Sequence, residues 1–147
     1  MVHISTTTRT IIYNTFIKMI TQTEQYLIII SGLWLVVAGI IMFTKPLTAK
    51  NIIAKAGSTT LINYTELWLR GIRAMAILLY APLSKFQFFF ELFGIMLGIT
   101  TFILLLIPRS WHAAFAIWSS SKLTLPLLKL CAPCSICFGF FLIYAVI

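Results

Sequence analysis

The chain has 147 residues, of which 61% are hydrophobic and only 10% are charged. Soluble domains carry about 25% charged residues, so the composition excludes an ordinary water-soluble domain and indicates that lipid surrounds most of the chain. The net charge of +8 comes from cations spread over the loops between apolar stretches. That spread is typical of membrane topology signals, and it argues against nucleic acid as a partner.

The first 25 residues are predicted to form a polar, threonine-rich arm that precedes a membrane domain of residues 26–147. The composition resembles a transit peptide, but a loose arm ending in a short interfacial helix near Ile11–Ile20 is the favoured interpretation. The apolar positions do not gather on one clean helix face. A secretory signal is not expected, because the first apolar run starts only at Tyr26.

Four membrane-spanning helices are predicted after the arm. Their ranges are about 26–43, 61–82, 86–107 and 125–147. The first is about 27 Å long as a helix, just enough to cross a bilayer. Spans two and three are joined by a link of only three residues, Leu83–Lys85, so they should be antiparallel neighbours. Pro133 should kink the fourth span.

Two connections between spans are predicted to lie at the membrane surface. The loop of residues 44–60 contains three lysines and could form a short helix over Ala49–Ala56. In residues 110–122, Trp111, Phe115 and Trp118 share one helix face. A ligand-stacking surface is one interpretation of this face, but an interfacial anchor is favoured, because tryptophan is enriched in the headgroup layer.

The cations predict the orientation of the chain. The larger set lies in the two surface connections and consists of Lys45, Lys50, Lys55, Arg109 and Lys122, whereas the opposite side carries Arg9, Lys18 and Lys85. The positive-inside rule places the larger set in the cytoplasm and both termini outside it.

A polar stripe inside the second span is the most informative feature of the sequence. Asn63, Glu66, Arg70 and Arg73 fall within an arc of about 80° on a helix. Glu66 and Arg70 have the spacing of a helical ion pair, and Glu91 of the third span should lie within reach of Arg73. We therefore predict a polar network of these five residues inside the membrane, with Glu66–Arg70 and Arg73–Glu91 pairs.

This network has a structural and a functional interpretation. It could only fix helix packing and register, or it could form a polar cavity that binds an anion or relays protons, as ionisable residues inside membranes often do. The structural interpretation is favoured, because a neutralised network has no spare charge for a ligand.

Three cysteines, Cys131, Cys134 and Cys137, follow one another at steps of three in the fourth span. Thiol–disulfide exchange, ligation of a soft metal and plain packing are all compatible with this spacing. Packing is favoured, because the chain has no fourth cysteine for a cluster and apolar surroundings oppose a thiolate. The identity of any metal stays open.

The sequence contains no arrangement of nucleophile, histidine and carboxylate at useful spacing, no phosphate-binding glycine loop and no zinc motif. No catalytic residue and no cofactor is therefore predicted, and whether the protein is an enzyme stays open, with a non-enzymatic role expected.

Two short motifs carry a resemblance to a known group of proteins. Glu66-Leu67-Trp68-Leu69-Arg70-Gly71 opens span two, and Ile107-Pro108-Arg109-Ser110-Trp111-His112 closes span three. Over residues 26–112 the layout resembles the small, uncharacterised four-helix proteins of bacterial inner membranes. The resemblance implies a multi-pass protein of the bacterial inner membrane, and it implies no activity.

The predicted fold class is all-α: a polytopic membrane protein with a bundle of four transmembrane helices and short interfacial helices. The leading functional hypothesis is an accessory or assembly subunit whose partners are the lipid bilayer and another membrane protein or a second copy. Gly94 and Gly98 have the G-x-x-x-G spacing of packed membrane helices. A carrier or channel element built on the polar network, and a thiol or metal protein built on the cysteines, are the alternatives.

Overall fold

The computed structural model describes residues 6–56 and 58–147, and the chain is all-α over this part. Its elements are α1 (Thr6–Thr44), α2 (Pro46–Ala54), α3 (Thr60–Tyr80), the 3-10 helix η1 (Ala81–Leu83), α4 (Gln87–Leu106), α5 (Arg109–Lys122) and α6 (Leu125–Val146). The first five residues of the predicted arm lie outside the described residues.

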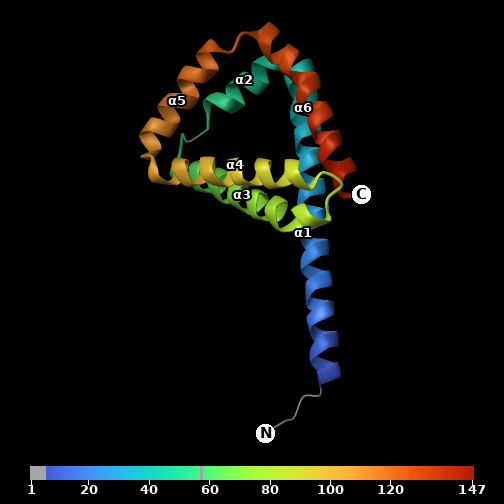
Figure 1. Ribbon diagram of the computed structural model, residues 1–147. Coiled ribbons are helices and arrows are strands. Elements are labelled where there is room, and N and C mark those ends of the chain that lie inside the picture. Colours follow the sequence, from blue (N-terminus) through green and yellow to red (C-terminus); the bar gives the residue numbers. More distant parts are fainter. Residues whose placement is uncertain (1–5, 57) are drawn as a thin grey trace.

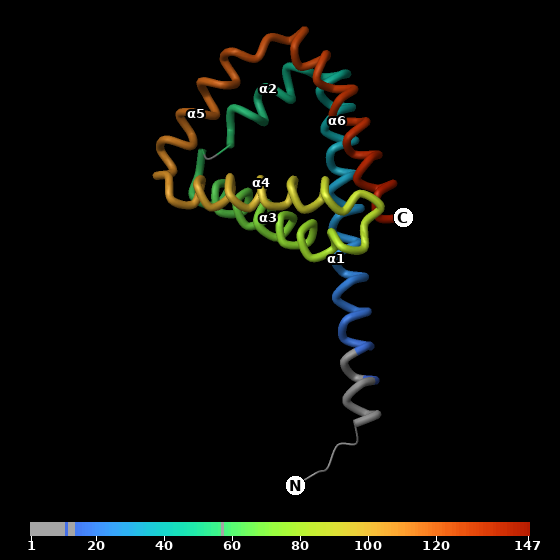
Figure 2. The backbone as a smooth tube through the Cα atoms, viewed as in Figure 1, coloured from blue at the N-terminus to red at the C-terminus, as the bar shows by residue number. Residues whose placement is uncertain are grey.

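Helix α1 is a single helix of 39 residues, about 58 Å long at the usual rise per residue. The arm predicted before residue 26 is, from Thr6 onward, the first part of this helix and not a loose segment with a short helix of its own. The physical reason is local: no proline or glycine interrupts the sequence between Thr6 and Ser31. The N-terminal part of α1 extends away from the other helices (Figures 1 and 2).

Helices α1 and α6 form a closely packed antiparallel pair (Figure 1). A Cβ atom added at Gly32 would lie 2.7 Å from the backbone oxygen of Gly139, and one added at Gly39 would lie 2.9 Å from that of Ala132. Small residues therefore let the two backbones touch, as is common between membrane helices. The Ser135 hydroxyl also donates a hydrogen bond of 2.8 Å across the pair to the carbonyl oxygen of Leu35.

Helices α3 and α4 form a second antiparallel pair, as the short link predicts. The Thr59 hydroxyl caps α3 by accepting a hydrogen bond from the Ile62 N–H, and η1, which contains Pro82, reverses the chain after Tyr80. A Cβ atom added at Gly94 would lie 2.6 Å from the Leu78 side chain, so Gly94 lets α4 approach α3.

The two pairs cross one another and do not form the predicted bundle of four helices lying side by side. Figure 1 shows α3 and α4 running across α1 and α6, while α2 and α5 pack against each other and close the third side of a triangle. The segments that connect the two pairs decide this arrangement. They contain α2 and α5, which hold the far end of the α3–α4 pair away from α1.

The core lies where the two pairs meet. Ile28, Ile77, Phe90 and Leu142 are almost fully buried there. Polar contacts hold the junction as well: Gln25 Nε2 and the Tyr80 hydroxyl both donate to the backbone oxygen of Val146, at 2.7 and 3.2 Å, and the Lys85 N–H donates to that of Ala145 at 3.1 Å.

Three of the described helices are long and apolar enough to cross a membrane: Asn14–Thr44 within α1, Gln87–Leu106 and Leu125–Val146. They indicate a multi-pass helical membrane protein. Helix α3, the second predicted span, is not among them. It carries three ionisable residues within two turns, Glu66, Arg70 and Arg73, so the predicted count of four spans is not shown.

Candidate functional site at the junction of the helix pairs

A small cavity between the two helix pairs brings two residues of the predicted stripe together. Arg70 and Arg73 of α3 line this cavity, whose volume is about 160 Å³. The other described residues that line it are Ser31, Trp34, Leu35, Ile77, Phe93, Leu97, Phe138 and Leu142. No acidic side chain belongs to this lining among the described residues, so the cavity is cationic with largely apolar walls.

The predicted pair between Arg73 and Glu91 does not fit the register of the hairpin. Gly94 packs against Leu78, and Thr101 is the nearest contact of Gly71. Arg73 is therefore level with Ile99, about 12 Å of helix rise away from Glu91. The cause is the turn: η1 continues the rise of α3 before the chain reverses, which shifts the register relative to a tight link. Glu91 instead accepts a hydrogen bond of 2.8 Å from Gln87 Nε2 of its own helix.

Glu66 lines a neighbouring surface groove and not the arginine cavity. Arg73 and Lys55 line this second groove with it. Arg73 therefore lies between an acid on one side and the cationic cavity on the other, whereas Arg70 lines only the cavity among the pockets described.

Asn63 belongs to a different polar contact. It is buried, and its Oδ1 lies 2.7 Å from Nδ1 of the equally buried His112 on α5. With the amide oxygen as acceptor, the His112 Nδ1–H is the donor. Nearby, Arg109 Nη1 donates to the Thr60 hydroxyl at 2.9 Å. Both bonds join the start of α5 to the start of α3. Sequence patterns alone offer no signal for this contact, because Asn63 and His112 lie 49 positions apart in the chain.

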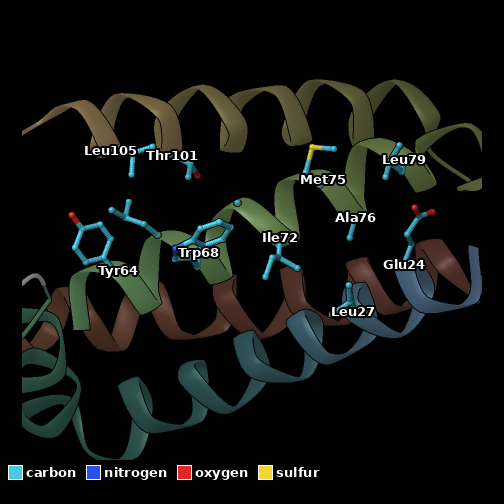
Figure 3. Close-up of a pocket in the computed structure, with 12 residues that line it drawn as sticks. Glu24, Leu27, Tyr64, Trp68, Ile72, Met75, Ala76, Leu79, Thr101 and Leu105 are labelled. Carbon is cyan, nitrogen blue, oxygen red and sulfur yellow. The ribbon is translucent and has the colours of Figure 1, made fainter. Parts of the chain in front are cut away.

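A larger groove of about 590 Å³ opens between α1, α3 and α4 (Figure 3). Its walls are apolar apart from Glu24 at one end and Tyr64 and Thr101 towards the other. The remaining lining residues are Leu27, Leu67, Trp68, Gly71, Ile72, Met75, Ala76, Leu79 and Leu105. The groove has the size and composition of a site for an apolar ligand or helix.

Glu24 is the residue in this groove that the sequence did not single out. Its side chain extends from α1 towards Ala76 and Leu79 of α3 (Figure 3) and is only 7% exposed. No hydrogen bond joins its carboxyl group to another described side chain, and no described side-chain oxygen is both enclosed and unpaired. The carboxyl group therefore opens to the groove, where the apolar walls make its charge costly unless water or a cation reaches it. The signal that could have found it is its position: it is the acid closest to the first apolar run, two residues before Tyr26.

The three cysteines are free and exposed on α6. Over the residues that the structure describes, no three histidine, cysteine, aspartate or glutamate side chains lie close enough together to hold a metal ion. The structure thus does not bring Cys131, Cys134 and Cys137 together as a three-ligand site.

The aromatic residues of α5 share an exposed face, as their spacing predicts. Trp111, Phe115 and Trp118 are all well exposed, and the rings of Phe115 and Trp118 lie 5.9 Å apart. Such a face suits the headgroup layer, so the interfacial anchor stays the favoured interpretation.

No protein-family model, curated protein or solved structure matches this chain.

Proposed function

We propose that the protein is a small, non-enzymatic integral membrane protein that acts as an accessory or assembly subunit of a complex in the bacterial inner membrane. One observation supports this proposal above the others: the groove of about 590 Å³ between α1, α3 and α4 contains the Glu24 side chain, which forms no hydrogen bond with another described side chain.

The occupant that fits this groove is a membrane helix of a partner subunit that places a lysine or arginine against Glu24. The apolar walls supply the packing surface, with Trp68 and Met75 both exposed in the isolated chain. Between membrane helices a polar contact adds to van der Waals packing, and a cation is the group that best compensates a buried carboxylate.

The proposed topology follows the cations. Helices α2 and α5, which pack together, carry or adjoin Lys45, Lys50, Lys55, Arg109 and Lys122. We place this side in the cytoplasm and both ends of the sequence outside it.

A charge variant with a matched control tests the partner. Glu24→Gln removes the acid from the groove, whereas Glu91→Gln removes an acid that already has a partner in its own helix and does not line the groove. After purification in mild detergent, the wild type and Glu91→Gln should retain a stoichiometric partner, and Glu24→Gln should lose most of it. Helix content by circular dichroism should be equal in all three proteins.

A second pair of variants tests the groove by volume. Gly71→Leu fills the groove, whereas Gly98→Leu adds the same atoms where no heavy atom lies within 4 Å. Only Gly71→Leu should reduce the co-purified partner. The proposal fails if the wild type purifies without a partner, or if the groove variants and their controls behave alike.

The arginine cavity favours a second candidate function, a carrier or channel element. This function needs a water-filled path to Arg70 or Arg73, and Ile77, which also lines the cavity, is a position to probe it. In a chain without native cysteines, Ile77→Cys should react with a water-soluble thiol reagent if this path exists. Complete protection would exclude this function.

A further inference from the structure

We infer that Arg70 and Arg73 bind a phosphate group, which is either the phosphate of a lipid headgroup or free inorganic phosphate. This inference does not rest on the partner helix, because the groove with Glu24 and the arginine cavity share no lining residue.

The cavity carries a net positive charge. Arg70 and Arg73 lie one turn apart on the same face of α3, and their positive charges repel each other. Glu66 lies in the neighbouring groove beside Arg73, with Lys55 as a further cation there. One acid against two arginines and a lysine leaves the junction positively charged.

The surroundings of the two arginines make their positive charge costly. The walls of the cavity are mainly apolar and aromatic, with Trp34, Phe93 and Phe138 among them. Three of the four helices that supply these walls are the candidate membrane spans. Cations in such surroundings are expensive unless an anion compensates them. A bound anion would offset both the desolvation of the guanidinium groups and their repulsion.

The size of the cavity and the geometry of the two guanidinium groups suit a phosphate. A cavity of about 160 Å³ has room for a tetrahedral oxyanion of five heavy atoms. A guanidinium group donates two parallel hydrogen bonds to such an anion, and two arginines on one face can share it. Phosphate, with its spread of negative oxygens, therefore matches this pair better than a single small halide.

Thermal unfolding of the purified full chain tests the inference. In phosphate-free detergent solution, the melting temperature is measured with inorganic phosphate, with chloride at equal ionic strength, and with micelles containing phosphatidylglycerol. Stabilisation by inorganic phosphate identifies a free oxyanion as the ligand, and stabilisation only by phosphatidylglycerol identifies the lipid headgroup. Either result supports the site, provided that it depends on the arginines.

The variants establish that dependence. Arg70→Gln/Arg73→Gln should bind the effective probe at least about tenfold more weakly, because it loses the charge-assisted hydrogen bonds of both guanidinium groups. Arg70→Lys/Arg73→Lys, which keeps the charge and loses the fork, should bind with intermediate strength. Lys129→Gln removes an exposed cation of α6 outside the cavity and should bind like the wild type.

The inference is overturned if neither probe stabilises the wild type, or if Lys129→Gln weakens binding as much as the arginine variants. Equal binding by the glutamine and wild-type proteins would overturn it as well. If the double glutamine variant does not fold, as judged by circular dichroism, the lysine variant decides: binding indistinguishable from the wild type would contradict the role of the guanidinium forks.

Discussion

At the scale of single residues, the ionisable and polar side chains of α3 serve different neighbours although they share one helix face. Asn63 contacts His112 of α5, Glu66 faces the groove that Lys55 also lines, and Arg70 lines the cavity with Arg73. Helical periodicity predicts that these residues share a stripe, and α3 is helical over all of them. It could not say which helix each would meet.

The Asn63–His112 contact should contribute measurably to stability. Asn63→Ala and His112→Ala each leave a buried polar partner without its hydrogen bond, which costs about 1–3 kcal/mol. The double variant should cost less than the sum of the two single variants, because it removes both groups. Chemical denaturation in detergent of the wild type, the two single variants and the double variant measures these costs. Additive single costs would show that the bond does not stabilise the fold.

At the scale of helices, three glycines permit contact between the backbones of α1 and α6, whereas Gly98 of α4 has no such neighbour. Gly32, Gly39 and Gly139 lie where α1 and α6 touch, whereas Gly98 faces open space on α4. Of the two glycines in the G-x-x-x-G spacing of α4, only Gly94 packs against another helix, α3. Gly98 has no described neighbour to pack against.

This difference predicts opposite results for one kind of substitution. Gly139→Ala places a Cβ atom 2.5 Å from the backbone oxygen of Gly32, and we expect it to destabilise the α1–α6 pair by about 1–3 kcal/mol. Gly98→Ala meets no atom and should stabilise α4 by about 0.5–1 kcal/mol through helix propensity. Melting temperatures in the same detergent compare the two. Equal effects would contradict the close approach of α1 and α6.

Register at the hairpin turn is also an element-scale property. The sequence places spans two and three next to each other, but the exact level at which their side chains meet depends on how η1 closes the turn. A shift of a single helical turn is enough to move Glu91 out of reach of Arg73. For this reason the sequence could predict that polar residues gather near one junction, but it could not predict which of these residues form pairs.

At the scale of the whole molecule, the crossing of the two helix pairs separates sites that a parallel bundle would bring together. In a bundle, the C-terminal ends of α1 and α4 would lie at the same membrane surface, with neighbouring axes about 8–10 Å apart. In the structure, α5 with its 14 residues lies between them along the third side of the triangle (Figure 1).

Spin labels can measure this separation. Labels at Phe43 and Leu106, both exposed, should be separated by roughly the length of α5, about 21 Å. Labels at Phe43 and Leu127 should be close in either arrangement, because α1 and α6 pair antiparallel at this end. A short Phe43–Leu106 distance in lipid would show that the four helices lie side by side.

The sequence by itself determined what local composition and periodicity dictate: an all-α chain, long apolar helices, the antiparallel α3–α4 hairpin, the exposed aromatic face of α5 and the polar stripe of α3. Tertiary structure alone decided the crossing of the helix pairs, the close approach of Gly32 and Gly139, the burial of Glu24 and His112, and the separation of Arg73 from Glu91. The physical reason is that helix formation depends on neighbours within a few residues, whereas these contacts join residues far apart in the chain. Their geometry depends on loops and turns whose shape no short stretch of sequence specifies.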